Sequence, residues 1–261
     1  MRIAAGAALL AAALGASAQE LVTIPTRPGV TQSFFIAGMG GREADAIALL
    51  YIGGYGNIDL RSENGQVRFA QGNFLPRARR EFIRNGVLPV IMDTPSDARD
   101  GVGDEYRTGK AQSVDARAVL AELRKRFPGI PVFIATTSRS TISGAQLGLE
   151  LGDEIAGVVL SSSMFASPRG RWPVITGVDF GAIKSRILFV HHRGDTCQAT
   201  PYSVAAQLGQ RFPLVTVEGG KPAESGPCDP LSPHGFYGRE APTVDAISAW
   251  MLGKPFARNI E

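Results

Sequence analysis

Residues 131–151 read PVFIATTSRSTISGAQLGLEL, and this stretch decides the fold. Pro131–Thr136 is a short and almost continuous apolar run, which is typical of a strand buried on both faces of a parallel sheet. A turn rich in serine and threonine follows at once, and Thr141–Leu151 has the pattern of a helix. The stretch therefore predicts a strand, a tight turn and a helix in direct succession.

The same alternation extends along most of the chain. Further apolar runs predict strands at Ala46–Ile52, Val87–Met92, Ala156–Ser161, Ile187–His192 and Leu214–Val217. Further helical patterns occupy Arg77–Arg84, Val114–Phe127, Pro201–Phe212 and Val244–Leu252. Alternating units of this kind predict an α/β fold, with one mostly parallel central sheet and helices on both faces. Val30–Ala37 precedes the alternation, and we expect it to form an antiparallel edge strand.

Length and composition restrict the class of protein. A chain of 261 residues, 44% of them hydrophobic, has enough apolar material for one large domain and is not a disordered protein. The sequence contains no internal repeat and no Pro/Gly/Ser-rich linker. We therefore predict that residues 19–261 form a single domain. The 27 Lys and Arg residues exceed the 24 Asp and Glu residues by only three and form no run of five. Nucleic acid is therefore not an expected partner.

The first eighteen residues have the pattern of a signal peptide. Arg2 supplies a positive charge, Ile3–Leu14 is apolar, and Ala16-Ser17-Ala18 is a small-x-small cleavage pattern. The apolar run is too short to cross a bilayer, and it has no polar face that would suit a buried amphipathic helix. We therefore expect a mature chain that begins at Gln19, is exported to the periplasm or secreted, and keeps no membrane anchor.

Ser138 is the candidate nucleophile. In parallel sheets functional residues gather at the carboxyl ends of the strands, and Ser138 lies in the turn between a strand and a helix, the context of a nucleophile elbow. The start of the helix would favour negative charge that develops there. Ser140 is a poorer candidate, because Ile142 would then occupy a crowded position of the turn. The alternative is that these hydroxyls only cap the helix.

Asp195 and His234 are the candidate acid and base. Asp195 follows the strand Ile187–His192, and His234 lies in a loop after the last predicted strand. The order of Ser138, Asp195 and His234 is that of α/β-hydrolase triads, whereas His191 and His192 precede the acid and break this order. His234 would take the serine proton, and Asp195 would orient the imidazole. The alternatives are an ordinary turn aspartate and a solvated loop histidine.

Two backbone N–H groups are needed to stabilise an oxyanion. The first is assigned to Arg139, which directly follows the candidate nucleophile. The second is assigned to Tyr55, with Gly54 as the alternative, in a glycine-rich turn (residues 53–56) after the strand Ala46–Ile52. This turn could also be an ordinary tight turn. The chain has no glycine-rich motif for nucleotides, and no cofactor is predicted.

Cys197 and Cys228 are the only cysteines. They lie close in sequence to Asp195 and His234 respectively, and in an exported protein we expect them to form a disulfide. This bond would tie the loop of the acid to the loop of the histidine. The alternative is a pair of reduced, buried cysteines. Too few cysteine and histidine ligands stand at suitable spacings for a metal site.

The sequence resembles the α/β-hydrolase superfamily over nearly the whole mature chain. It is especially similar to secreted bacterial serine hydrolases with a G-T-S-R-G-T elbow, a V-H-H-x-x-D-x-C stretch and a C-(x)n-H-G-F stretch. The matching positions are Thr137-Ser138-Arg139, Val190-His191-His192 with Asp195 and Cys197, and Cys228 with His234-Gly235-Phe236. Thr136 and Ser140 stand where that pattern has glycine. The resemblance implies the α/β-hydrolase fold and the reaction class of a hydrolase rather than a particular substrate. The expected partner is a small-molecule acyl substrate.

The expected function is that of an exported serine hydrolase, esterase-like, that cleaves an ester or a related acyl substrate through a Ser-His-Asp triad and an acyl-enzyme. One alternative is a serine peptidase with the same triad. The other is a catalytically inert binding protein on the same fold, and Thr136 in the elbow favours this second alternative. Between Ser161 and Ile187 the chain is too short for a helical cap domain, so we expect little or no lid. The sequence leaves the substrate's identity and the oligomeric state open.

Overall fold

The computed structural model describes residues 19–170 and 173–261. The predicted signal peptide (residues 1–18) lies outside the described residues. Within these two ranges, no helix combines the length and the apolar character that crossing a membrane requires.

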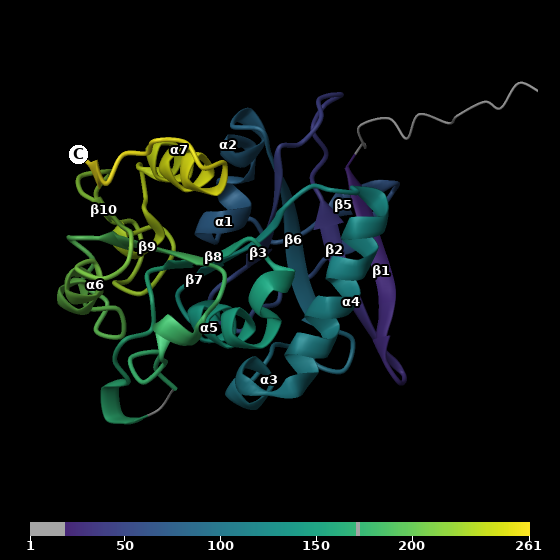
Figure 1. The fold of residues 1–261 in the computed structure, drawn as a ribbon, viewed down its shortest axis with the longest axis horizontal. Coiled ribbons are helices and arrows are strands. Elements are labelled where there is room, and N and C mark those ends of the chain that lie inside the picture. Colours follow the sequence, from purple (N-terminus) through teal and green to yellow (C-terminus); the bar gives the residue numbers. More distant parts are fainter. Residues whose placement is uncertain (1–18, 171–172) are drawn as a thin grey trace, which may run out of the picture.

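Nine strands form one central sheet (Figure 1), in the order β1-β2-β6-β3-β7-β8-β9-β10-β11. Their bounds are β1 Glu20–Arg27, β2 Val30–Ile36, β3 Ala46–Tyr51, β6 Val87–Pro95, β7 Val132–Thr137, β8 Gly157–Ser161, β9 Arg186–His192, β10 Leu214–Val217 and β11 Asn259–Ile260. β2 is antiparallel to both β1 and β6, and every other neighbouring pair is parallel. The predicted mostly parallel sheet is therefore confirmed.

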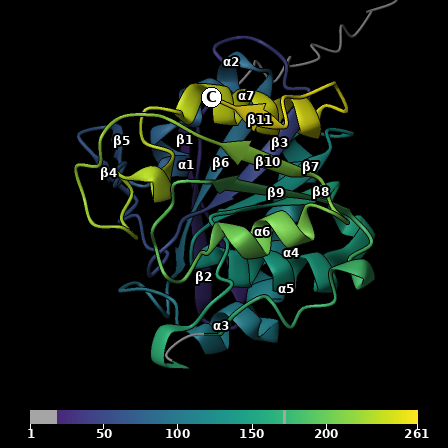
Figure 2. The ribbon, with the colours of Figure 1, turned by 90° about the vertical axis from the view of Figure 1, so that its left-hand side faces the viewer.

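Helices cover both faces of this sheet (Figure 2). One face carries α4 (Lys110–Arg126), α5 (Ser140–Leu151) and α6 (Tyr202–Leu208), and the other carries α1 (Phe74–Arg77), α2 (Arg79–Arg84) and α7 (Glu240–Met251). Since successive strand residues point to opposite faces, the strands contribute alternately to two apolar clusters. Leu49 of β3 packs with the α4 and α5 side, whereas Leu50 packs with the α1 and α7 side.

The amino-terminal end of the sheet differs from the sequence prediction. The strand predicted at Val30–Ala37 is present as β2, but it is not an edge strand, because β1 pairs with its outer side. β1 alternates apolar and polar residues and contains Pro25, which suits an outermost strand because proline donates no ladder hydrogen bond. The pattern that revealed the buried parallel strands therefore does not reveal this one.

Two connections also bear on the site. The helix predicted at Arg77–Arg84 is two short helices, α1 and α2, that meet at Ala78, and it is followed later by an unpredicted helix α3 (Asp104–Thr108). A small hairpin of β4 (Arg61–Glu63) and β5 (Gln66–Arg68) was also not predicted. Between β8 and β9, the described residues contain only two short 3-10 turns, Pro168–Gly170 and Phe180–Ala182. This agrees with the expectation of little or no lid.

Candidate active site

Ser138 follows the last residue of β7 and stands two residues before the first residue of α5, with a backbone φ of +55°. This left-handed conformation costs a residue other than glycine about 1–3 kcal/mol, and such conformations cluster at active sites. Surrounding hydrogen bonds hold it in place: the Ser138 N–H donates to Ser161 O (2.9 Å), and Ser138 O accepts from Thr141 N (2.9 Å) and Thr141 Oγ1 (2.7 Å). The turn has the strained strand-to-helix geometry of a nucleophile elbow.

The structure accounts for Thr136 at a position where glycine is usual. Thr136 is fully buried, and its hydroxyl donates to Val159 O at 2.9 Å. A Cβ built on Gly144 of the facing helix α5 would lie 2.7 Å from Thr136 Oγ1 and 2.8 Å from its Cγ2. The close approach of helix and strand therefore depends on a glycine in the helix in place of one in the strand.

Ser140, the other serine of the turn, uses its hydroxyl in hydrogen bonds to backbone groups. Its side chain is fully buried, its Oγ accepts from Thr137 N at 2.9 Å, and the same Oγ lies 2.7 Å from Tyr51 O, to which it can donate. These contacts tie the start of α5 to the ends of β3 and β7. Ser140 therefore stabilises the turn that presents Ser138.

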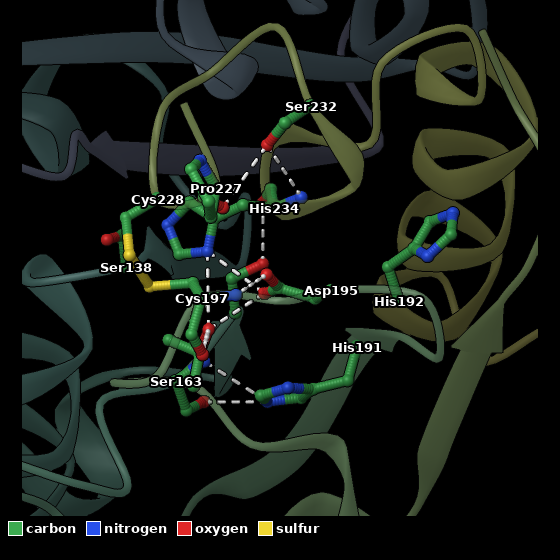
Figure 3. Close-up of polar contacts among 12 residues, drawn as sticks. Ser138, Ser163, His191, His192, Asp195, Cys197, Pro227, Cys228, Ser232 and His234 are labelled. Carbon is green, nitrogen blue, oxygen red and sulfur yellow. Dashed lines mark hydrogen bonds and ion pairs between the residues drawn. A yellow bond between two sulfur atoms is a disulfide. The ribbon is translucent and has the colours of Figure 1, made fainter. Parts of the chain in front are cut away.

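Asp195 and His234 form a buried pair (Figure 3). His234 lies in a single 3-10 turn, Pro233–Gly235, and its Nδ1 is 2.9 Å from Asp195 Oδ2. The carboxylate also accepts hydrogen bonds from Cys197 N (2.9 Å) and Thr200 Oγ1 (2.7 Å). An Asp carboxylate at Nδ1 holds the proton on that nitrogen and leaves the Nε2 lone pair free to act as a base.

Ser138 and His234 line one cleft, together with Gly53 and Gly54, and the cavity volume is about 160 Å³. In Figure 3 the imidazole lies between Ser138 and Asp195. His234 Nε2 is buried and has no hydrogen-bond partner among the described residues, and no hydrogen bond joins it to Ser138 there. Such catalytic contacts are often long before substrate binds. The structure thus brings the three predicted triad residues to one place.

The other two histidines have different roles. His192 Nδ1 accepts from Gly194 N, and its Nε2 donates to Gly219 O, each at 3.0 Å. His191 is fully buried, its Nε2 accepts from Ser163 N, and burial lowers its pKa to about 3. Both rings are therefore engaged as neutral side chains, and neither makes a hydrogen bond to Asp195 in the described part of the chain.

Cys197 and Cys228 form a disulfide, with an S–S distance of 2.04 Å and a Cα–Cα distance of 4.7 Å. The predicted pairing is therefore present. Cys197 N donates to the Asp195 carboxylate, while Cys228 lines the cleft beside His234. The bond connects the loops that carry the acid and the base.

The candidate oxyanion donors occupy different places. Arg139 directly precedes α5, and its guanidinium is held away by Asp104 Oδ1 at 2.8 Å. Gly54 lines the cleft, whereas Tyr55 is not among the lining residues and its side chain is 66% exposed. A Cβ on Gly53 would lie 2.9 Å from Ser138 Cβ, so only glycine allows this loop to approach the serine so closely.

Arg107 was not singled out from the sequence. It belongs to α3, is 2% exposed, and donates from Nη2 to Gly54 O (2.8 Å) and from Nη1 to Ser143 Oγ (3.2 Å) on α5. Burial lowers its pKa to about 10, which leaves it a cation at neutral pH. It connects the glycine loop to the helix behind Ser138. In the sequence, the nearby charged residues Asp104 and Glu105 indicate an exposed segment, so a buried arginine is not expected there.

Thr200 and Arg77 also support the site and were not predicted to do so. Thr200 Oγ1 donates to Asp195 and lies 3.3 Å from His234 Nδ1. Arg77 donates from Nη2 to Gly235 O (2.8 Å) and from Nε to Glu240 Oε1 (2.9 Å), which attaches the histidine loop to α1 and α7. The adjacent Pro201 suggests only a helix start at Thr200, and no local pattern identifies Arg77.

No cation site accompanies this arrangement within residues 19–170 and 173–261, because no three His, Cys, Asp or Glu side chains there are placed to hold a metal ion. The Arg139 guanidinium is paired with the Asp104 carboxylate, and the Asp195 carboxylate accepts a hydrogen bond from His234 Nδ1.

By sequence, the chain matches no family model and no curated protein. Its fold is similar to a soluble variant of monoglyceride lipase from Saccharomyces cerevisiae (TM-score 0.59, 14% identity, 90% of this chain and 95% of that one). It is also similar to an esterase from Pyrococcus furiosus (TM-score 0.56, 15% identity, 77% and 82%). A third similar structure is a serine hydrolase without a lid from Xanthomonas campestris (TM-score 0.52, 16% identity, 87% and 93%). The chain therefore has the predicted α/β-hydrolase fold.

Proposed function

We propose that the chain is a serine hydrolase that cleaves ester bonds through an acyl-enzyme. The observation that carries this proposal is that one cleft is lined by a serine in a strained strand-to-helix turn and by the histidine of a buried Asp–His pair. A serine that only capped a helix would need neither the left-handed backbone nor a histidine beside it. The fold's similarity to two esterolytic enzymes and a lidless serine hydrolase supports esters as substrates.

The proposed mechanism uses Ser138, His234 and Asp195 in turn. His234 Nε2 takes the proton from Ser138 Oγ as this oxygen attacks the acyl carbon, and Asp195 stabilises the imidazolium that forms. His234 then protonates the departing alcohol, and a water molecule activated by His234 hydrolyses the acyl-enzyme. Thr200 and Cys197 donate to Asp195 and thereby hold the carboxylate in the orientation that His234 requires.

The oxyanion would be stabilised by two backbone N–H groups, from Arg139 and from the glycine loop. We assign the second donor to Gly54 in place of Tyr55, since Gly54 lines the cleft with Ser138. The buried cation of Arg107, bonded to Gly54 O, would favour the same negative charge from behind the loop.

The test is covalent labelling. A fluorophosphonate should label the wild type, and Ser138→Ala should abolish labelling, whereas Ser62→Ala on the exposed strand β4 should not. Hydrolysis of p-nitrophenyl butyrate should fall by at least about 10³-fold in Ser138→Ala and in His234→Ala. Labelling that persists in Ser138→Ala would exclude this serine. Cleavage of a peptide panel in preference to the esters would indicate the peptidase instead.

We also propose that the protein acts after export, as a periplasmic or secreted enzyme. The apolar run of residues 3–14, the pattern Ala16-Ser17-Ala18 and the disulfide Cys197–Cys228 support this location. Expression in a bacterium followed by fractionation and amino-terminal sequencing should give a mature chain that starts at Gln19. Full-length protein retained in the cytoplasm would contradict the proposal.

A further inference from the structure

The cleft is lined by three polar side chains that the proposed reaction does not use, the buried Thr137 and two others, Asn73 and Asp229. Asn73 lies directly before α1, and Asp229 lies in the loop between Cys228 and His234. Both line the same cleft as Ser138. Since polar groups at a binding cleft orient the ligand, their hydrogen-bonding capacity indicates what the cleft binds.

Asn73 has an amide without a partner. Its Oδ1 is buried and makes no hydrogen bond, and the side chain does not cap α1 although the residue occupies the capping position. Within the described residues neither amide atom of Asn73 is engaged. Buried amides are normally hydrogen-bonded, because leaving them unpaired forfeits their interaction with water. The buried Oδ1 is out of a ligand's reach, so the atom that Asn73 offers to a ligand in the cleft is the donor Nδ2.

Asp229 offers an acceptor. Its Oδ2 accepts from Gly226 N at 3.2 Å, which leaves Oδ1 available, and the part of the chain that is described provides no ion pair for it. Among the described residues that line the cleft, Asp229 is the only acidic one, and none is a lysine or an arginine. The cleft therefore disfavours anionic substrates and favours groups that donate hydrogen bonds.

One functional group satisfies both side chains. A hydroxyl group donates to the Asp229 carboxylate through its proton, and its oxygen accepts from the Asn73 Nδ2. An ammonium group suits Asp229 but cannot accept from the amide, and a carboxylate is repelled by Asp229. Phe74 and Pro230, which also line the cleft, offer apolar contact to the carbon skeleton of such a ligand.

We propose that Asn73 and Asp229 form a hydroxyl-binding subsite beside Ser138, and that the substrates are uncharged esters carrying free hydroxyl groups near the scissile bond. The inference rests on the proposed esterase function. The hydroxyl groups can belong to the alcohol half, as in a polyol or sugar ester, or to the acyl half, as in a hydroxy-acid ester. The proposal identifies the hydroxyl group as the feature that is bound, whichever half of the ester carries it.

Matched esters test the proposal with the intact protein. For the alcohol half, kcat/KM is compared between glyceryl monobutyrate and n-propyl butyrate, and for the acyl half between ethyl 3-hydroxybutyrate and ethyl butyrate. The hydroxylated ester should be preferred by about tenfold in at least one arm, as expected for one or two added hydrogen bonds. The arm that shows the preference identifies the half that carries the hydroxyl groups.

The variants Asn73→Ala, Asn73→Leu and Asp229→Asn should each reduce this preference several-fold, because kcat/KM should fall more for the hydroxylated ester than for its alkyl partner. Asp153→Asn, in the exposed turn after α5, is the control and should keep the wild-type preference. Two of these variants alter the same position, so a folding defect in one leaves the other as the test.

Three outcomes would overturn the subsite: equal rates on both members of each ester pair, a preference unchanged in all three variants, or stronger preference for butyrylcholine than for glyceryl monobutyrate. Each of them leaves the esterase function intact, provided that ethyl butyrate is hydrolysed and Ser138 is labelled. Absence of that turnover and labelling would instead contradict the proposed function itself.

Discussion

At the scale of single residues, the candidate site depends on side chains that hold backbone groups in place. Arg107 is the clearest case, since its guanidinium bonds the carbonyl of Gly54 and the hydroxyl of Ser143 while almost fully buried. These two hydrogen bonds join the loop of Gly54, a candidate oxyanion donor, to helix α5, which follows Ser138. A cation in this position also lowers the energy of negative charge that develops in the cleft.

Replacing Arg107 by methionine should lower kcat for p-nitrophenyl butyrate by about 10–100-fold and leave KM within about threefold, because the loop and the charge act mainly in the transition state. Arg107→Lys retains the charge without the planar fork and should recover part of the loss. Arg117→Met removes the surface bond to Glu154 and is the control. An unchanged kcat in Arg107→Met would show that Arg107 acts on stability alone.

The residues found from the sequence and those found only in the structure differ in a physical way. Ser138, Asp195 and His234 were identified because parallel strands end at a common edge and because the chain order of triads is characteristic. Thr200 and Asn73 acquire their places from contacts between segments far apart in the chain. No local pattern encodes such contacts, so sequence reasoning could not have assigned them.

At the scale of elements, the contact between β7 and α5 positions Ser138, the proposed nucleophile. Gly144 of α5 packs on Thr136 of β7, and alanine at 144 would place its Cβ 2.7 Å from Thr136 Oγ1 and 2.9 Å from Leu160 Cδ2. Alanine normally favours a helix over glycine by about 1 kcal/mol. Overpacking a buried contact costs about 1–3 kcal/mol. Here this cost should exceed the gain in helix propensity, because the helix cannot withdraw from the sheet.

Gly144→Ala should therefore lower the free energy of unfolding by about 1–2 kcal/mol, measured by urea denaturation, and should reduce activity by displacing Ser138. The double variant Gly144→Ala/Thr136→Ala should recover most of the stability, because it removes the Thr136 side-chain atoms that the new Cβ would meet. A Cβ at position 148 would lie 3.0 Å from Ile183 Cδ1 and 3.3 Å from Val158 Cγ2, which are longer distances than those at position 144, so Gly148→Ala should cost less. Additive losses in the double variant would refute the direct contact.

The same scale explains which elements could be predicted. β3, β6, β7, β8 and β9 are buried on both faces and appear in the sequence as continuous apolar runs. β1, the β4–β5 hairpin and α3 are short or partly exposed and have no such run. Their positions depend on pairing with, or packing against, the rest of the fold.

The disulfide between Cys197 and Cys228 joins two loops that are separated by 31 residues. Closing a loop of this length stabilises the folded state by about 3–4 kcal/mol in the chain-entropy model. Cys197→Ser/Cys228→Ser should lower the free energy of unfolding by about 2–4 kcal/mol and should lower kcat/KM, because Cys197 N and His234 flank Asp195. Dithiothreitol should reproduce both effects in the wild type and neither in the double variant. An unaffected kcat/KM would separate the disulfide from catalysis.

At the scale of the whole molecule, burial of histidine makes stability depend on pH. His191 is fully buried between the sheet and Phe165, with ring centroids 5.1 Å apart, and burial lowers its pKa from 6.5 to about 3. The unfolded chain binds a proton at this position below about pH 6.5, whereas the folded protein does not until about pH 3. The stability that His191 contributes is therefore complete above pH 6.5 and is lost as the pH falls.

Between pH 6 and pH 5, His191 alone should decrease the free energy of unfolding by about 1 kcal/mol. Urea denaturation at both values should show a correspondingly smaller decrease in His191→Gln, whose amide oxygen can still accept from Ser163 N. Burial also lowers the pKa of His192, so His192→Gln is the comparison that separates the two rings. If the free energy of unfolding decreased as much in His191→Gln as in the wild type, His191 would not contribute to the pH dependence. His191 would then bind its proton equally in the folded and the unfolded states, which would contradict the prediction.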